Sequence, residues 1–387
     1  MVDSSINFPT QKHFTICSHC VLDTTIPQIR FDEQGICNFC KSHDLMMAFY
    51  PRVENVLNKL REELISKIKS SGRNKKYDCI VGISGGTDST YTLYLAKKLG
   101  LKPLAVHLDD GWDSTTAVTN IHNAVRKLNV DLETFVLDWE QIRRLHAAFF
   151  KASVPDPGVP TDVAILGALY QTALKEHIKY ILGGQSFMTE GTQPLQWSFI
   201  EGTYVESINR LFGHVPLKNY PNVTIYHVAY YTFIKGIKHI PFLNYFNYSK
   251  KEAQKILSQE LEWTYYGGHH YESIFPQFIN AYYNLKKFNI DRRKVTLSAS
   301  VRMGQITRPE ALQILRDPPT IEREMIEYCI KKLDFSQSEF AQIMLKKPKN
   351  FRDYQTSYGL LKKIRFLIKL AVKMKLITPV LYEKYLS

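Results

Sequence analysis

The sequence lacks several features that would assign it to a broad class at once. It has no run of about 18 consecutive apolar residues, which predicts no transmembrane helix. The first residues, MVDSSINFPTQKHF, contain no apolar signal core, so we expect the chain to stay in the cytosol. Internal repeats and low-complexity segments are also missing. The 387 residues therefore predict a globular protein of two or three domains.

Acidic residues are few relative to basic ones. The 50 Lys and Arg side chains outnumber the 37 Asp and Glu side chains, which leaves a formal net charge of +13. Such a charge favours a polyanionic ligand, which could be a nucleic acid, a nucleotide or an anionic membrane surface. The charge alone does not choose among these three.

Cysteine is scarce as well, yet four of the six cysteines form two close pairs. Cys17 with Cys20, and Cys37 with Cys40, have the C-x2-C spacing of a zinc ribbon. Two disulfides are the alternative, but a cytosolic chain disfavours them. Four thiolates would complete a closed tetrahedral site, so we predict a structural zinc ion. The residues between the pairs predict two short strands joined by a turn at 32–35.

The patterns along the chain predict four regions. They are a zinc-ribbon module at 1–50, a linking helix at 51–76, an α/β domain at 77–235, and a helical, aromatic-rich region at 236–387. The predicted strands of the α/β domain are 78–84, 102–110, 132–138 and 179–186, and its predicted helices are 89–99, 117–128, 140–150 and 163–177. This alternation predicts a parallel sheet with helices on both faces.

The last region contains two recognisable helix signals. Thr307 and Glu310 have the capping-box spacing, which predicts a helix start. Residues 360–375 read as a basic amphipathic helix. Its apolar face could contact an anionic membrane surface, but we expect it to pack on its own domain or on a subunit.

Two adjacent glycines stand between a predicted strand and a predicted helix in VGISGGTDST, residues 81–90. Ligands of open parallel sheets bind beyond the carboxyl ends of the strands. Glycine lets the backbone approach a ligand, and a helix start offers N–H groups and a positive dipole end. We therefore predict an anion cradle suited to phosphate. The Walker and G-x-G-x-x-G patterns do not fit, and a plain turn capped by Ser84 or Asp88 is the alternative.

Residues 84–89, SGGTDS, resemble the SGGxDS signature of the PP-loop ATP pyrophosphatase superfamily. Within that superfamily the chain resembles the N-acetyl sugar amidotransferases of bacterial surface-polysaccharide pathways. The resemblance covers nearly the whole chain, including the paired cysteines, YDCIVGISGGTDSTY, WTYYGGHHYESIFPQF and DRRKVTLSASVRMGQITRPEAL. It implies a PP-loop domain with an N-terminal zinc ribbon and a helical C-terminal region.

The resemblance also implies a reaction. The acetamido oxygen of a sugar or sugar nucleotide attacks the α-phosphorus of ATP and releases pyrophosphate. Ammonia then displaces AMP and leaves an acetamidino group. The implied cofactors are ATP and Mg²⁺ in addition to zinc, and positioning with charge stabilisation would supply the catalysis.

The implied ATP and pyrophosphate site begins with the loop. Its residues are Ser84, Gly85, Gly86, Thr87, Asp88 and Ser89. Asp88 is expected to bind Mg²⁺ directly or through water. Many family members have lysine where this chain has Thr87, so a charge is missing. We expect Lys294 and Arg302 to complete the phosphate pocket.

Other expected site residues follow predicted strands or begin helices. Gly183 and Gly184 end the fourth predicted strand, where the superfamily closes over ATP. His107 borders the adenine or ribose, or is a packed strand residue. Asp162 contacts the substrate or metal, or only caps its helix. The resemblance further implies a sugar-nucleotide site at His269, His270 and Glu272.

The source of ammonia and a rival function are also predicted. Cys79 and Cys329 lie in an apolar strand and a helical stretch, so we expect packed thiols rather than a glutaminase nucleophile. A separate class I glutaminase subunit would then supply ammonia, and no nucleic acid partner is expected. The rival is a PP-loop tRNA-modifying enzyme of the sulfur-transfer type, which would need a reactive cysteine pair or an iron–sulfur cluster. A zinc-ribbon adaptor, the third class, would not need an ATP loop.

Overall fold

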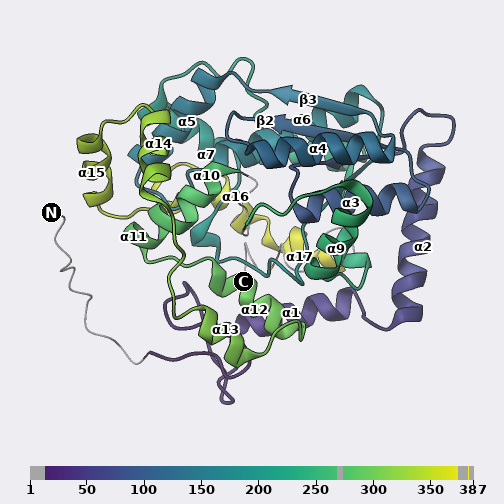
Figure 1. Cartoon of the computed structure of the whole chain (residues 1–387), viewed down its shortest axis with the longest axis horizontal. Helices are drawn as coiled ribbons and strands as arrows, with labels where there is room; N and C mark the ends of the chain where they lie inside the picture. The colour runs from purple at the N-terminus through teal and green to yellow at the C-terminus, as the bar shows by residue number, and fades with distance from the viewer. Residues whose placement is uncertain (1–13, 268–272, 374–381, 383–387) are drawn as a thin grey trace.

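The fold is built on one parallel sheet. The computed structural model describes residues 14–267, 273–373 and 382 (Figure 1). The strands are β1 Cys79–Gly82, β2 Pro103–Asp109, β3 Leu132–Val136, β4 Tyr180–Gly183 and β5 Lys238–Pro241. Their order across the sheet is β3-β2-β1-β4-β5, and every pairing is parallel. The predicted α/β class is confirmed.

Helices connect and surround these strands. Up to β5 and just after it they are α1 Asn38–Phe49, α2 Glu54–Ser71, α3 Thr87–Lys98, α4 Thr115–Leu128, α5 Trp139–Lys151, α6 Val159–Lys175, α7 Gly202–Ile208, α8 Ile225–Ala229 and α9 Lys250–Leu261. The C-terminal helices are α10 Ile274–Phe278, α11 Asn284–Phe288, α12 Arg293–Arg302, α13 Arg308–Ile314, α14 Arg323–Lys332, α15 Gln337–Leu345, α16 Tyr358–Lys363 and α17 Arg365–Lys373. Short 3-10 or π segments are η1 Leu195–Trp197, η2 Asn209–Gly213, η3 Tyr230–Ile234, η4 Phe242–Tyr245, η5 Ile279–Tyr283 and η6 Phe351–Asp353.

The two faces of the sheet bury different sets of side chains because alternate strand residues point to opposite faces. Ile80 packs on one face with Leu145 of α5. Its neighbour Val81 packs on the other face with Leu93 of α3 and Leu257 of α9. Helices α5 and α6 therefore cover one face, while α2, α3, α4 and α9 cover the other. This two-sided burial explains why the central strands β1 and β4 read as continuous apolar runs.

The sheet extends slightly past the predicted domain boundary. Strand β5, residues 238–241, pairs with β4 and was not predicted. The expected end of the α/β domain at residue 235 falls just before this strand. The sequence of β5, KHIP, is short and contains proline, which suits an edge strand.

The strand order reverses between β1 and β4. Strands β2 and β3 lie on one side of β1, and strands β4 and β5 lie on the other. Such a switch point leaves a crevice at the carboxyl ends of the two central strands. The residues that follow β1 and β4 are therefore the ones positioned to meet a ligand.

The cysteine module is more irregular than predicted. The expected turn is confirmed, since Gly35 N donates to the Asp32 carbonyl at 2.9 Å. The two expected strands are reduced to isolated bridges, Ile16 with Asp23 and Phe31 with Cys37. Figure 1 shows α12 and α13 below the sheet beside α1, the helix of the module, and α12 packs against the module.

The C-terminal region is helical, as predicted. Thr307 and Glu310 form the expected capping box at the start of α13. The predicted helix 360–375 is divided at Ile364 into α16 and α17. Leu361 of α16 packs against the core, while Leu367 of α17 is 61% exposed, so the packing expected of this apolar face is seen only in part. Among the described helices, none is long and apolar enough to cross a membrane.

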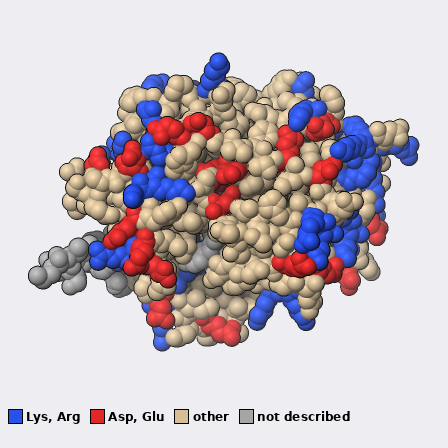
Figure 2. Space-filling view, turned by 45° about the horizontal axis from the view of Figure 1, so that its top comes forward, with Lys and Arg blue, Asp and Glu red and all other residues tan. Residues whose placement is uncertain are grey.

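The positive charge of the chain is spread over its surface. On the face shown in Figure 2, basic side chains form several separate groups with acidic side chains between them. A protein that binds nucleic acid through its backbone usually presents a basic stripe or patch. This face does not show a continuous one.

Candidate active site and cysteine cluster

The glycine pair lies at the switch point, between β1 and α3. Gly85 has a φ of +75°, which residues with a Cβ rarely adopt. A Cβ at this position would also lie 2.3 Å from the carbonyl oxygen of Ala117 in α4. The Gly85 carbonyl accepts hydrogen bonds from Asn120 Nδ2 at 3.3 Å and Trp263 Nε1 at 2.9 Å. This position requires glycine, and two neighbouring segments fix the course of the loop.

Helix α3 begins directly after the glycine pair. Its N-cap is Gly86, whose lack of a side chain leaves the cap position open. The first N–H groups and the positive end of the helix dipole therefore face the loop. The predicted caps Ser84 and Asp88 are wrong, because the N-cap is Gly86 and the helix begins at Thr87, two residues earlier than predicted. Ser84 Oγ instead accepts from Gly86 N at 3.3 Å and lies 3.1 Å from Ser89 Oγ.

The second predicted glycine pair lies beside the loop. A Cβ on Gly184 would stand 2.9 Å from the backbone of Asp88 and Ser89. A Cβ on Gly183 would stand 2.1 Å from Gln185 Oε1. The chain leaving β4 therefore packs directly on the first turn of α3. The structure brings both predicted glycine pairs together at one point.

Asp88 meets two side chains from the start of α9 and the residues before it. Lys250 Nζ lies 3.2 Å from Asp88 Oδ2, and the Tyr248 hydroxyl donates a hydrogen bond to Asp88 Oδ1. The Lys250 and Asp88 side chains are 27% and 16% exposed, so a ligand can reach the pair. Burial lowers the pKa of Lys250, but Asp88, with Tyr266 and Glu190 nearby, raises it above its ordinary value. Lys250 is therefore a cation beside the loop.

Thr87, the departure from the family signature, also contacts α9. Gln254 Nε2 donates to Thr87 Oγ1 at 3.3 Å. The backbone N–H of Thr87 donates to the Tyr266 hydroxyl at 3.2 Å. Gln254 lies one helical turn after Lys250, so both project from the same face of α9. One face of this helix therefore contacts two consecutive residues of the loop.

Lys294 and Arg302 lie elsewhere, at the cysteine module. Lys294 Nζ contacts Asp23 Oδ2 at 2.6 Å and Thr25 Oγ1 at 3.0 Å. Arg302 donates from Nε to Cys40 Sγ at 3.2 Å and from Nη2 to Cys20 Sγ at 3.3 Å. Both side chains project from α12, which packs on the module. The structure thus gives them anchoring contacts there and brings neither to the phosphate loop.

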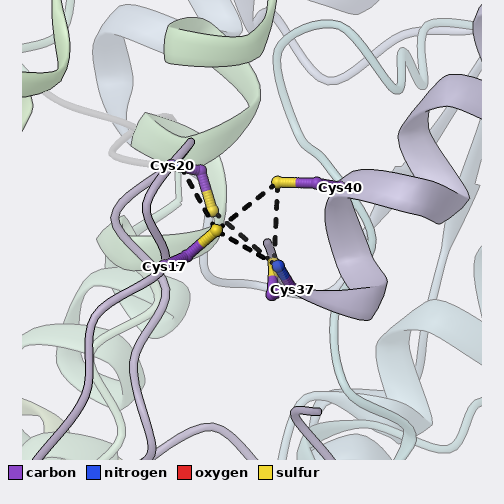
Figure 3. Close-up of side chains that lie close together, drawn as sticks. All are labelled: Cys17, Cys20, Cys37 and Cys40. Carbon is purple, nitrogen blue, oxygen red and sulfur yellow. Dashed lines mark hydrogen bonds between the residues drawn. The ribbon is translucent and has the colours of Figure 1, made fainter. Parts of the chain in front are cut away.

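The four paired cysteines converge (Figure 3). The sulfur of Cys17 lies 3.8 Å from that of Cys40, and the sulfur of Cys37 lies 3.7 Å from Cys20 and 3.6 Å from Cys40. Four sulfurs at about 2.3 Å from a tetrahedral zinc ion would be about 3.8 Å apart. The cluster therefore fits zinc, and four thiolates leave no open position for a substrate. The four cysteines are free thiols, so the alternative of two disulfides is not formed.

His107 is held at both ring nitrogens. Nδ1 lies 3.0 Å from the carbonyl oxygen of Ile83, the residue that enters the loop. Nε2 lies 3.1 Å from Asp113 Oδ2. Burial lowers the pKa of His107, but Asp113 and the Ile83 carbonyl together raise it above its ordinary value. His107 is thus a buried residue that also positions the loop, which the strand pattern did not reveal.

This arrangement predicts a pH-dependent contribution of His107 to stability. A raised folded-state pKa means that the contribution is full below the ordinary pKa of about 6.5 and is lost as the pH rises through the folded value. We expect His107→Gln to be less stable than the wild type by about 1 kcal/mol near pH 6 and by less near pH 9. Urea denaturation at the two pH values measures this. A difference that grows with pH would contradict the assignment.

Asp162 lies in the first turn of α6, where the N-cap is Gly158. Asp162 therefore does not cap the helix. Its neighbour Thr161 donates to Asp110 Oδ2 at 2.6 Å and lies 3.0 Å from His146 Nε2. Burial raises the pKa of Asp110 to about 6. The start of α6 is thus tied to the end of β2, at the ligand-facing edge of the sheet. His269, His270 and Glu272 lie outside the described residues.

Sequence reasoning missed Lys250, Tyr248 and Gln254. A usable signal was present, since Ser249 and Glu252 have the spacing of a capping box. Ser249 is indeed the N-cap of α9, and its hydroxyl accepts from Glu252 N at 3.4 Å. The motif locates a helix start but says nothing about what that helix contacts.

The C-terminal part of the chain is similar to one known protein family. Residues 272–367 match the family described as LPS biosynthesis protein WbpG-like, C-terminal domain. This part of the chain is similar to that domain, and we refer to residues 272–367 below as the WbpG-like domain. The match confirms the resemblance to surface-polysaccharide proteins that the sequence predicted. The WbpG-like domain includes α12, which supplies the side chains that hold the cysteine module.

Two known proteins resemble parts of the chain that differ in length. An uncharacterized protein of Methanocaldococcus jannaschii, MJ1599, is 25% identical over 321 residues, which cover 80% of this chain and 96% of the relative. The tRNA(Ile)-lysidine synthase of Chlamydia caviae is 38% identical over 53 residues, 14% of this chain and 17% of its own length.

Solved structures align as well. The NH3-dependent NAD synthetase of Campylobacter jejuni aligns with 13% identity, a TM-score of 0.30, and coverage of 76% of this chain and 98% of its own. The NMN synthetase of Francisella tularensis aligns with 13% identity, a TM-score of 0.32, and coverage of 73% and 95%. The loop at the switch point and the WbpG-like domain together support an enzyme of the PP-loop ATP pyrophosphatase type.

Proposed function

We propose that this protein is an ATP-dependent amidotransferase that converts the N-acetyl group of a sugar or sugar nucleotide to an acetamidino group. The observation that carries the proposal is the SGGTDS cradle at the switch point of a chain with a WbpG-like domain. The cradle suits the phosphates of ATP. The WbpG-like domain points to a surface-polysaccharide sugar as the acceptor.

The reaction balances without an enzyme nucleophile. The acetamido oxygen bonds to the α-phosphorus of ATP while the bond to pyrophosphate breaks. Ammonia then adds to the imidate carbon, the carbon–oxygen bond breaks, and AMP leaves with the former amide oxygen. Asp88 would hold Mg²⁺ directly or through water, and the N–H groups at the start of α3 would bind pyrophosphate. Catalysis would rest on positioning and on charge stabilisation.

Ammonia would come from a separate class I glutaminase. Cys79 and Cys329, the two cysteines outside the cluster, are fully buried. Burial raises the pKa of Cys79 well above its usual range and that of Cys329 to about 12. The thiolate is the nucleophilic form of cysteine, so neither residue suits glutaminase chemistry at neutral pH. With ATP and the sugar, the chain alone should therefore form AMP when ammonium chloride is the nitrogen source. It should not form AMP when glutamine is the nitrogen source.

Isotope transfer tests the proposed reaction. N-acetylated sugars and UDP-N-acetyl sugars whose amide oxygen is a heavy isotope are incubated with the protein, ATP, Mg²⁺ and ammonium. We expect a product in which NH replaces the amide oxygen, and AMP that contains the heavy oxygen. Unlabelled AMP formed with an amidine product would contradict the adenylyl imidate. AMP formation stimulated by tRNA, and by no sugar, would favour the tRNA-modifying alternative.

Asp88→Asn tests the role of Asp88 in the same assay. The amide preserves the shape of the side chain but not the charge that would hold the metal. We expect AMP formation to fall by about 10²-fold or more with little change in melting temperature. Turnover close to that of the wild type would remove Asp88 from the site.

A further inference from the structure

The charge that the loop lacks at Thr87 has a specific replacement. We propose that Lys250, at the start of α9, is the residue that binds the ATP phosphates in place of a loop lysine, and that it exchanges Asp88 for a phosphate oxygen when ATP and the metal bind. This inference rests on the proposed use of ATP. It assigns to Lys250 a role that neither the loop motif nor the family resemblance indicated.

The position of Lys250 is fixed by packing rather than by a mobile loop. Helix α9 contacts α3 along its length, and Leu257 is fully buried against the sheet face that also buries Leu93. Ser249 caps α9, so Lys250 is its first residue. A side chain on a packed helix is held more precisely than one on a loop. Lys250 is therefore positioned beside α3 before any ligand binds.

The same face of α9 contacts the loop at two adjacent positions. Gln254 bonds to Thr87, and Lys250 bonds to Asp88. The resemblance implies that many family members carry a lysine at the position of Thr87. A lysine ammonium at the start of α9 thus occupies space next to the position where the loop would otherwise place one. The distance to be covered is small, since Lys250 Nζ is already 3.2 Å from the residue that follows Thr87.

The exchange leaves no charge unpaired. In the structure the ammonium of Lys250 neutralises the carboxylate of Asp88. A metal ion bound by Asp88 would take over this role and repel the ammonium. The flexible four-carbon stem of lysine lets the ammonium turn to a phosphate oxygen, which it binds as a point charge. In the structure Lys250 is protonated, because Asp88 and the negative groups near it raise its pKa above the ordinary value against the effect of burial. A phosphate oxygen would replace Asp88 as the negative partner of the ammonium.

If the ion pair between Lys250 and Asp88 had only a structural role, the expected result would differ. A partly exposed pair contributes little to stability, so its loss alone would change neither folding nor ATP affinity greatly. The test compares Lys250→Met and Lys250→Arg with Lys251→Met, which removes the same charge from the exposed neighbouring residue. Binding of Mg²⁺–ATP is measured by calorimetry without any sugar, and AMP formation with the sugar and ammonium.

For Lys250→Met we expect a loss of about 10²-fold or more in AMP formation, weaker Mg²⁺–ATP binding and little change in melting temperature. Lys250→Arg should keep part of the affinity, and Lys251→Met all of it. The double variant Thr87→Lys with Lys250→Met should recover at least about tenfold in ATP affinity, since the charge returns to the loop. A structural role predicts no such rescue.

The outcomes separate this inference from the proposed function. If the wild type binds Mg²⁺–ATP and Lys250→Met binds it equally well, the inference is wrong while the proposed function stands. If the wild type does not bind Mg²⁺–ATP at all, the proposed function fails first. If the double variant does not fold, as its melting curve would show, the comparison of Lys250→Met, Lys250→Arg and Lys251→Met decides alone.

Discussion

Cys37→Ser is expected to abolish zinc binding and to destabilise the whole protein. The Cys37 sulfur lies within 3.7 Å of two other cluster sulfurs, so the hydroxyl would leave an incomplete tetrahedron. A ligand at a thousandfold its Kd stabilises a folded protein by about 4 kcal/mol, and structural zinc typically exceeds this. We therefore expect a loss of about 4 kcal/mol or more in the free energy of unfolding. Zinc content per chain and thermal denaturation measure the two effects.

The loss should extend beyond the cysteine module because two parts of the chain meet there. Val295 of α12 packs in the same buried cluster as the cysteines. Arg308 donates to the carbonyl oxygens of Cys17 at 2.9 Å and Cys20 at 3.0 Å. Cys329→Ser is the control, since this buried thiol lies outside the cluster. It should lower stability and keep the zinc. Zinc retained by Cys37→Ser would contradict the four-thiolate site.

Arg302 has a clear role in this cluster. A zinc ion with four thiolates keeps a net negative charge, and the guanidinium of Arg302 donates to two of the sulfurs. Groups that bond to ligand atoms tune the affinity of a metal site. The block of sequence that suggested a phosphate ligand thus joins the WbpG-like domain to the cysteine module.

The local patterns were sufficient for strands β1 to β4 and for the helices between them. Buried parallel strands read as apolar runs, and the amphipathic helices between them have a clear period, so both could be located from the sequence. Strand β5 escaped because its four residues, KHIP, are only partly buried and form no apolar run. The convergence of the four cysteines could also be predicted from the sequence, since their spacing reflects a local geometric need.

The contacts of the phosphate loop could not be predicted in the same way. Lys250 and Asp88 are 162 residues apart in the sequence, and their contact exists only because α9 packs beside α3. Lys294 and Arg302 were chosen because they lie in a block that resembles the family. Resemblance to a family indicates that a block of sequence has a function, but only the position of the block in the fold shows which residues it contacts. Packing therefore decides which cation stands beside Asp88.

Gly85→Ala is expected to have the second large effect. A left-handed φ costs a residue with a Cβ about 1–2 kcal/mol, and the contact with the Ala117 carbonyl adds a clash that backbone must relieve. We expect a loss of about 3 kcal/mol in the free energy of unfolding. The loop would move away from α4, and a displacement of about 1 Å at a reacting group can lower the rate by about 10²-fold. Urea denaturation and AMP formation measure the two losses.

Gly359→Ala is the matched control for the same change of side chain. Gly359 is exposed in α16, and a Cβ there would meet nothing within 4 Å. Alanine restricts the unfolded chain, so this variant should be as stable as the wild type or more stable by about 0.4–1 kcal/mol, with unchanged activity. Normal ATP binding by Gly85→Ala would show that the loop can shift without loss of ATP affinity. In that case the tight approach of Gly85 to α4 would serve folding alone, and the anion cradle would depend on the start of α3.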